Sequence, residues 1–324
     1  MKKFLASAGV ICCSFITLAA NWVYDSSAKT LTRGSVVLQN VDANGKNLTI
    51  NNNQSNTTAT DLDFSVAIDD DYVLKNINGA AFNGNTNVQT LITPTSLVWI
   101  GYNAFSKCTG LTKLRLAEGL TSVGQQTFSE CTALSDWDNK IPSTLTDASY
   151  QMFYGCTSLT GEVTIPEGIA TYNAMFKSTG ISKLTLTATT KIDGYACFNT
   201  SSSLSTIILS TNLTTIGASE RIFGDLGAHN NVHLSIYWRS CPETISANIF
   251  NGNNNGIITN YLPWRLKSAW EDYAETTTGK NWQLTLPATY DGTGSWATAN
   301  WNGAPAMVVK WWKDKPNGLR ISIR

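Results

Sequence analysis

A phenylalanine recurs at a nearly constant spacing through the middle of this 324-residue chain. Successive copies are 22 to 27 residues apart, at Phe82, Phe105, Phe128, Phe153, Phe176, Phe198, Phe223 and Phe250. A period of this length is typical of repeat architectures, in which each unit packs mainly on its two neighbours. The length of the chain, which exceeds that of most single domains, is therefore compatible with one continuous array.

Each repeat unit has three parts. An aliphatic residue, often followed by glycine as in Ile100-Gly101, precedes the phenylalanine, and in three units a cysteine follows the phenylalanine at the third position. A strand with the pattern L-x-x-L-x-L comes next, as in 111–116. Because side chains alternate along a strand, the apolar residues of this pattern point inward and the intervening residues point outward. The residues of this unit that we expect inside are Phe105, Cys108, Leu111, Leu114 and Leu116.

These units resemble the BspA-like subclass of leucine-rich repeats, whose pattern is approximately I-G-x-x-A-F-x-x-C-x-x-L-x-x-I-x-L-P. The segment 100–116 matches almost throughout, and the match weakens after Phe198. The resemblance implies a β-rich repeat solenoid in a secreted or surface-displayed protein. It also implies recognition of proteins or glycans at a cell surface or in a matrix.

The segments on either side of the repeats are predicted to close the array. Residues 21–75 contain short alternating runs separated by turn-forming Asn, Asp, Gly and Ser, which favours an N-terminal β cap ahead of a solenoid at 76–262. Apolar residues at i, i+4 and i+7 (Leu266, Trp270 and Tyr273) predict a short helix in a C-terminal cap at 263–282. Residues 283–324 alternate strand-like runs with turns and predict a small, Trp-rich β module.

The first 20 residues are typical of a secretory signal peptide. Lys2 and Lys3 precede an uncharged run from Phe4 to Ala20, and a polar chain follows from Asn21. The run is shorter than the roughly 20 residues that a membrane-spanning helix needs, which favours a cleaved signal over an uncleaved anchor. No later stretch is apolar enough to span a bilayer, so we expect a secreted or cell-surface protein.

The overall charge disfavours a nucleic-acid partner. The formal net charge is zero, only 14% of residues are charged, and the sequence has no basic patch. The sequence also lacks a glycine-rich phosphate loop, an EF-hand loop and an H-E-x-x-H motif, so no cofactor is expected.

Three cysteines, Cys108, Cys131 and Cys156, occupy the same repeat position and are expected to form a row. They have two interpretations, as metal ligands or as small apolar residues of the core. A closed zinc site needs four convergent ligands, and no His or fourth Cys joins this row. The sequence therefore favours buried thiols and predicts no metal site.

Outward-facing strand residues form a candidate binding face. Its members are Lys113, Arg115, Asp136, Asp138, Glu162 and Lys183. Asp136 and Asp138 also suggest a pair of catalytic carboxylates. However, Lys113 and Arg115 lie one repeat away with the opposite charge, which favours solvated ion pairs between neighbouring strands and no catalytic residue.

Tryptophans are concentrated near the C-terminus, where seven of the eleven fall between Trp264 and Trp312. Exposed aromatic side chains stack on sugars and anchor protein interfaces, so four of these residues are a candidate aromatic platform. They are Trp296, Trp301, Trp311 and Trp312. The alternative is that a small β module needs large side chains to build its core.

Three hypotheses of function follow. The first is a secreted or cell-surface binding or adhesion protein that uses its repeat face to recognise proteins or glycans. The second is a structural spacer anchored to the envelope or to a polysaccharide by the Trp-rich module. A glycan-active enzyme is a remote third, and the sequence favours a protein without enzymatic activity.

Overall fold

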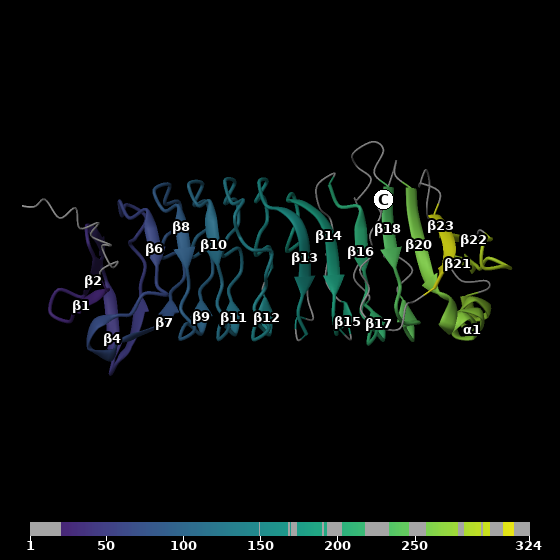
Figure 1. Ribbon diagram of the computed structural model, residues 1–324, viewed down its shortest axis with the longest axis horizontal. Helices are drawn as coiled ribbons and strands as arrows, with labels where there is room; N and C mark the ends of the chain where they lie inside the picture. Colours follow the sequence, from purple (N-terminus) through teal and green to yellow (C-terminus); the bar gives the residue numbers. More distant parts are fainter. Residues whose placement is uncertain are drawn as a thin grey trace, which may run out of the picture.

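The computed structural model is a β-rich, elongated stack of repeat units (Figure 1). Each unit is one turn of the chain, called a coil below, and the coils follow one another in sequence order along the long axis. It describes residues 21–148, 150–167, 169, 174–189, 191–192, 203–217, 233–245, 257–277, 282–292, 294–298 and 307–313. The predicted signal peptide, Phe198, Phe223 and Phe250 lie outside these residues. No helix among the described residues is long and apolar enough to cross a membrane.

The N-terminal end is built from antiparallel strands. β1 (Val23–Asp25), β2 (Thr30–Arg33) and β3 (Val36–Leu38) form one sheet, and β4 (Val41–Asn44) pairs with β5 (Asn47–Ile50). A short 3-10 helix, η1 (Asp69–Asp71), follows β6 (Asp61–Asp63). Trp22 is fully buried there and donates its indole N–H to the carbonyl of Asp63.

Each of the next coils contributes one strand to each of two parallel sheets. The first sheet joins β6, β8 (Thr90–Ile92) and β10 (Lys113–Arg115). The second sheet continues from β4 and β5 through β7 (Val73–Ile77), β9 (Trp99–Ile100), β11 (Ser122–Val123) and β12 (Asp147–Ala148). These two rows run along the upper and lower edges of the stack in Figure 1.

The later coils form a second pair of sheets. Eight strands make the larger sheet, in the spatial order β13 (Thr160–Ile165), β14 (Gly180–Leu186), β16 (Thr206–Ile208), β18 (His233–Tyr237), β20 (Ile257–Pro263), β23 (Met307–Trp312), β22 (Gly294–Thr298) and β21 (Trp282–Thr285). The smaller sheet joins β15 (Lys191–Ile192), β17 (Thr215–Ile216) and β19 (Thr244–Ile245). The predicted C-terminal helix is present as α1 (Lys267–Thr277), preceded by the 3-10 turn η2 (Trp264–Leu266).

The recurring phenylalanines stack on one another through the core. Ring centroids of Phe82, Phe105, Phe128, Phe153 and Phe176 are 4.8 to 5.7 Å apart, with interplanar angles between 8° and 16°. All five side chains are at most 2% exposed. Aromatic pairs of this kind add about 0.5–1.5 kcal/mol beyond the burial of their area. The interior positions predicted for the 100–116 unit are also buried.

The backbone around each phenylalanine forms a further hydrogen-bonded link between coils. The residue two positions before and the residue two positions after the phenylalanine have a positive φ, as at Asn103 (53°) and Lys107 (61°). Alternation of this kind points every second N–H toward the next coil. Asn103, Phe105 and Lys107 accordingly donate to carbonyls of residues 125, 127 and 129 at 2.8 Å. The strain of a left-handed non-glycine residue is thus offset by a hydrogen bond between coils.

The buried cysteines also form hydrogen bonds between neighbouring coils. Cys108, Cys131 and Cys156 are fully buried free thiols, and each Sγ donates to a phenylalanine carbonyl of the preceding coil at 3.0 to 3.2 Å. Among the described residues, no group of three or more His, Cys, Asp or Glu is placed to hold a metal ion. Burial raises the pKa of the Cys108 thiol to about 12, so this group stays protonated at neutral pH.

Substitutions at Lys107 test the left-handed turn. The side chain is exposed, and the equivalent residue is Gly84 in the preceding coil and Gly155 two coils later, both with positive φ. Lys107→Gly is expected to preserve or raise the free energy of unfolding, whereas Lys107→Val should lower it by about 1–2 kcal/mol because a β-branched residue is strained at positive φ. Lys107→Ala controls for loss of the lysine side chain. Denaturant unfolding measures all three, and equal stability for Ala and Val would contradict the turn.

The thiol row predicts a dependence on pH. Because the folded state holds the Cys108 proton to about pH 12 and the unfolded state releases it near 9, the free energy of unfolding should fall as pH rises through this interval.

At pH 8.5, peptide-mapped alkylation should label Cys108 only after denaturation, whereas a cysteine introduced at exposed Thr109 should react in the native protein. Equal labelling of Cys108 in the native and unfolded states would contradict its burial.

Candidate binding surfaces

The charged residues predicted for the outer face form ion pairs between neighbouring coils. Arg115, at the end of β10, contacts the carboxylate of Asp136 and lies 3.8 Å from that of Asp138 (Nε to Oδ2). Its guanidinium also donates to the backbone carbonyl of Asp136 at 2.7 Å. Farther along, Lys183 on β14 contacts Glu162 on β13 at 2.8 Å. These pairs link the strands, and their partial exposure limits each to about 0.2–1 kcal/mol.

The outer face is interrupted at the Trp137 coil. Asp136 pairs with Lys113 in a single bridge, after which Asp138 and Asn139 turn with positive φ. The next bridge, to Thr164, is formed by Lys140. The repeat pattern predicts Asp138 in that position. The turn accounts for the longer step between Phe128 and Phe153, which contains two extra residues relative to the step before it. The described strands therefore make two sheets on this side instead of one continuous face.

The two aspartates do not form an isolated carboxylate pair. Both carboxylates contact the same guanidinium, and their side chains are 55% and 40% exposed. This arrangement, with one guanidinium between two partly exposed carboxylates of the next coil, is suited to linking neighbouring coils.

Two of the four tryptophans proposed as an aromatic platform are part of the core. Trp311 and Trp312 on β23 are only 4% and 8% exposed. Their indole N–H groups donate to the carbonyls of Pro287 and Trp238 at 2.9 and 3.1 Å. The platform interpretation is wrong for this pair, because β23 continues the sheet beyond β20 and needs apolar residues there. Trp301 and the side chain of Trp296 lie outside the described residues.

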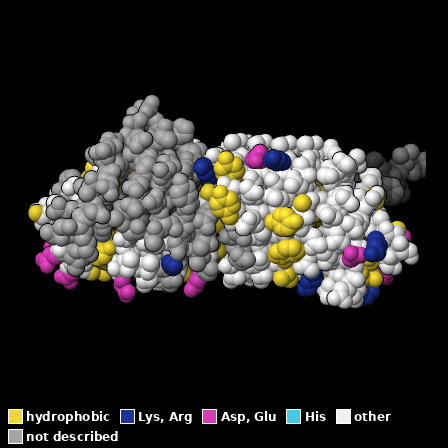
Figure 2. All heavy atoms as spheres, turned by 180° about the vertical axis from the view of Figure 1, so that it is seen from behind, with side chains coloured by type: hydrophobic (Ala, Val, Ile, Leu, Met, Phe, Trp, Pro, Cys, Tyr) yellow, Lys and Arg dark blue, Asp and Glu magenta, His cyan; other side chains and the backbone are white. Residues whose placement is uncertain are grey.

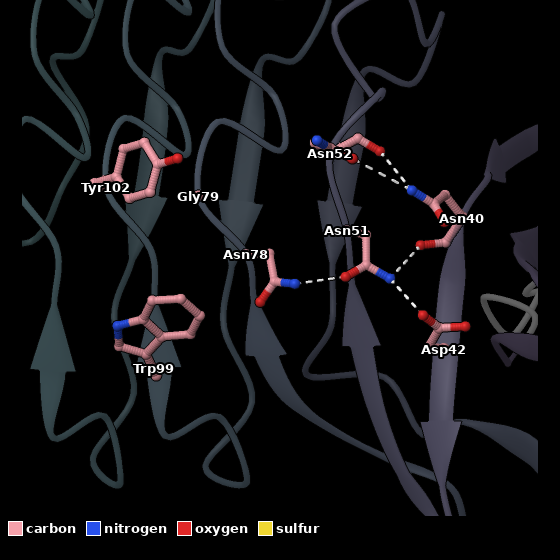
Figure 3. Close-up of a pocket in the computed structure, with 8 residues that line it drawn as sticks. All are labelled: Asn40, Asp42, Asn51, Asn52, Asn78, Gly79, Trp99 and Tyr102. Carbon is pink, nitrogen blue, oxygen red and sulfur yellow. Dashed lines mark hydrogen bonds between the residues drawn. The ribbon is translucent and has the colours of Figure 1, made fainter.

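A groove of about 520 Å³ lies at the opposite end of the molecule, where the N-terminal strands meet the first coils. Its lining combines amide and aromatic side chains from the second sheet and the turns that follow its strands (Figure 3). The lining residues are Asn40, Asp42, Asn51, Asn52, Asn78, Gly79, Trp99 and Tyr102. We call this surface the asparagine groove.

Hydrogen bonds connect the asparagines of the groove in sequence across three strands. Asn51 donates to the carbonyl of Asn40 and to the carboxylate of Asp42, both at 3.0 Å, and accepts from Asn78 (Figure 3). Asp42 is the only charged residue of the lining, and Lys29 contacts it at 2.8 Å. The hydrogen bond and the charge of this ammonium lower the pKa of Asp42. The groove is therefore polar and close to electrically neutral at pH 7.

The sequence pattern gave little indication of this groove. The Asn-rich segment 51–56 is typical of an exposed turn, and a single Trp and a single Tyr in a long chain are not a motif. The available signal was that Trp99 and Tyr102 are each flanked by small or polar residues in both adjacent coils. Their neighbours in the adjacent coils are Asn76 and Ser122 beside Trp99, and Gly79 and Gln125 beside Tyr102.

Comparisons with solved structures give distant similarities. A leucine rich cell surface protein from Faecalibacterium prausnitzii is 15% identical with a TM-score of 0.38, and the match covers 72% of this chain and 88% of that one. A leucine-rich repeat protein of T. pallidum is 19% identical with a TM-score of 0.33, covering 49% and 86%. One from Bacteroides ovatus is 13% identical with a TM-score of 0.26, covering 80% and 97%. A search of curated proteins finds no match.

The repeats themselves are matched by a family model. The model of the BspA type leucine rich repeat region matches residues 64–171 and 138–256, with six copies in all. Together these ranges include more than half of the 324 residues, and they contain the stacked phenylalanines and the buried cysteines described above. The chain therefore belongs to the BspA-type leucine-rich repeat family.

Proposed function

We propose that this protein is secreted or displayed at a cell surface, where it binds a protein or glycan ligand through the exterior of its repeat stack. The observation that carries this proposal is the contrast between the buried and the exterior residues of each coil. The five stacked phenylalanines and the three cysteines of the thiol row are buried in the core, while the intervening strand and turn residues are on the exterior, on a backbone held by hydrogen bonds between coils. Such a frame holds exterior side chains in fixed positions, which lowers the entropy lost on binding.

Family membership and the environments of the reactive groups support binding over catalysis. Asp136 and Asp138 share Arg115, and the thiols of Cys108 and Cys131 have raised pKa values, Cys131 through its hydrogen bond with Cys156 and through burial. A thiolate nucleophile requires the opposite shift. The hypothesis of a glycan-active enzyme therefore loses the isolated carboxylate pair on which it rested.

The spacer-and-anchor hypothesis is weakened by the position of the C-terminal strands. β23 pairs with β20 over six residues, and Trp311 stands 5.5 Å from Trp264 in an edge-to-face arrangement. Removing residues 283–324 would take β22, β23 and most of β21 from the sheet and expose this aromatic core. A truncation would therefore destabilise the repeats as well as remove any anchor, and single substitutions are the better test.

A binding screen tests the proposal. Purified protein is applied to arrays of matrix proteins, host-cell surface proteins and glycans, while surface proteolysis of intact producing cells and analysis of the medium locate the chain. We expect at least one ligand with a Kd in the micromolar range or tighter, and a chain found outside the cell. Retention of the chain inside the cell, or no ligand on any array, would contradict the proposal.

Charge reversal then maps a ligand to the outer face. Arg115→Glu combined with Lys183→Glu should weaken a ligand of that face at least tenfold, with a change in unfolding free energy of about 1–2 kcal/mol for the loss of three partly exposed ion pairs. Lys267→Glu, which breaks a comparable pair with Glu271 on α1, is the matched control. Equal binding by the double variant and the control would place the ligand elsewhere.

A further inference from the structure

We infer that the asparagine groove binds a neutral sugar unit of a glycan, an assignment that rests on the proposed binding function and gives it a location. The groove is distinct from the charged outer face, because its residues belong to the second sheet, to the turns after β5, β7 and β9 and, for Asn40, to the turn before β4. Its volume falls within the range of about 300–1,000 Å³ typical of small-molecule sites.

The aromatic wall of the groove is not required by the repeat. Trp99 pairs in register with Asn76 on one side and Ser122 on the other, so a polar residue satisfies this strand position in both adjacent coils. Tyr102 is 59% exposed, more than any other large hydrophobic residue described. Burial in the core therefore explains neither ring. Both rings lie on the same side of the groove, across from Asn40 and Asn51 (Figure 3).

Gly79 creates the space that the tyrosine ring occupies. A Cβ atom at position 79 would stand 2.5 Å from Cε1 and 2.8 Å from Cδ1 of Tyr102. The ring thus rests against the backbone of the preceding coil, which fixes its position while leaving most of its surface open. Gly79 and Tyr102 of the next coil together produce a hollow beside an aromatic ring.

The opposite wall offers hydrogen-bonding groups that are held in place. Asn51 uses both of its side-chain donors and accepts one bond. In the described part of the chain, the Asn78 side-chain oxygen, the Asn52 side-chain nitrogen and the Tyr102 hydroxyl have no partner. The groove therefore presents at least one free acceptor and one free donor beside two aromatic rings.

Neutral sugars match this combination. Their hydroxyl groups both donate and accept, which suits side-chain amides, and their C–H groups form apolar patches that stack on aromatic rings. A charged ligand is disfavoured because Asp42 is already neutralised by Lys29. From behind, the N-terminal half shows hydrophobic side chains set among uncharged polar surface, with charged side chains mainly toward its margins (Figure 2).

Titration with a panel of neutral hexose and N-acetylhexosamine oligosaccharides tests the assignment, with sialylated and sulfated oligosaccharides for comparison. We expect a neutral oligosaccharide to bind, and Trp99→Ala and Tyr102→Ala each to weaken it at least tenfold. Tyr102→Phe should cause a smaller loss because the ring is retained. Tyr150→Ala is the matched control, since this exposed tyrosine follows the same turn pattern two coils away and is not part of the groove.

Two further variants separate binding from folding. Asn78→Ala removes the free acceptor and should weaken binding about three- to tenfold. Gly79→Ala removes no group but displaces the Tyr102 ring, so it should weaken binding as Tyr102→Ala does. Thermal unfolding of each variant establishes that the stack is intact, and the Tyr102 and Trp99 variants, altered at the surface, keep the test valid if Gly79→Ala fails to fold.

The results separate the inference from the proposed function. Sugar binding that is equal in the Trp99, Tyr102 and Tyr150 variants overturns the groove as the site. A preference for charged oligosaccharides overturns the ligand chemistry. If the arrays yield only protein ligands and no neutral oligosaccharide binds, the inference fails and the binding function stands. If no ligand of any kind binds, the proposed function fails as well.

Discussion

The stacking of one coil on the next is the interaction on which the rest of this structure depends. No single coil encloses a core, so each phenylalanine is buried only because the ring of the next coil covers it. Hydrogen bonds from the phenylalanine segment reinforce this contact by joining the backbones at every second residue. The left-handed conformation of residues such as Asn103 and Lys107 follows from this requirement, because it turns their N–H groups toward the neighbouring coil.

Close stacking also restricts where side chains can stand. A Cβ atom at Gly101 would lie 2.3 Å from the backbone nitrogen of Gly79, which explains why glycine follows the aliphatic residue in these repeats. Gly79 and Tyr102 form a hollow, and the asparagine groove is the result. The ends of the stack depart most from the repeat, and both carry extra strands.

Much of the architecture was predictable because the repeat ties sequence position to spatial position. The interior set of the 100–116 unit, the row of buried thiols and the ion pair of Arg115 with Asp136 all follow from the period and from strand alternation. The surface was less predictable. The two extra residues in the Trp137 coil displace Asp138 from its column. Burial of Trp311 and Trp312 depends on the pairing of β23 with β20, which are separated by 43 residues in the sequence.

The sequence by itself determined the β-rich repeat fold, the spacing of the coils and the identity of the core, because these depend on a hydrophobic pattern that recurs along the chain. The tertiary structure alone decided where the asparagine groove forms. Trp99, Tyr102 and the asparagines of the groove come from four separate segments, and no local pattern records that their side chains meet. Their proximity arises from the register of neighbouring coils and from the missing side chain at Gly79. Only the stacked coils bring these residues together.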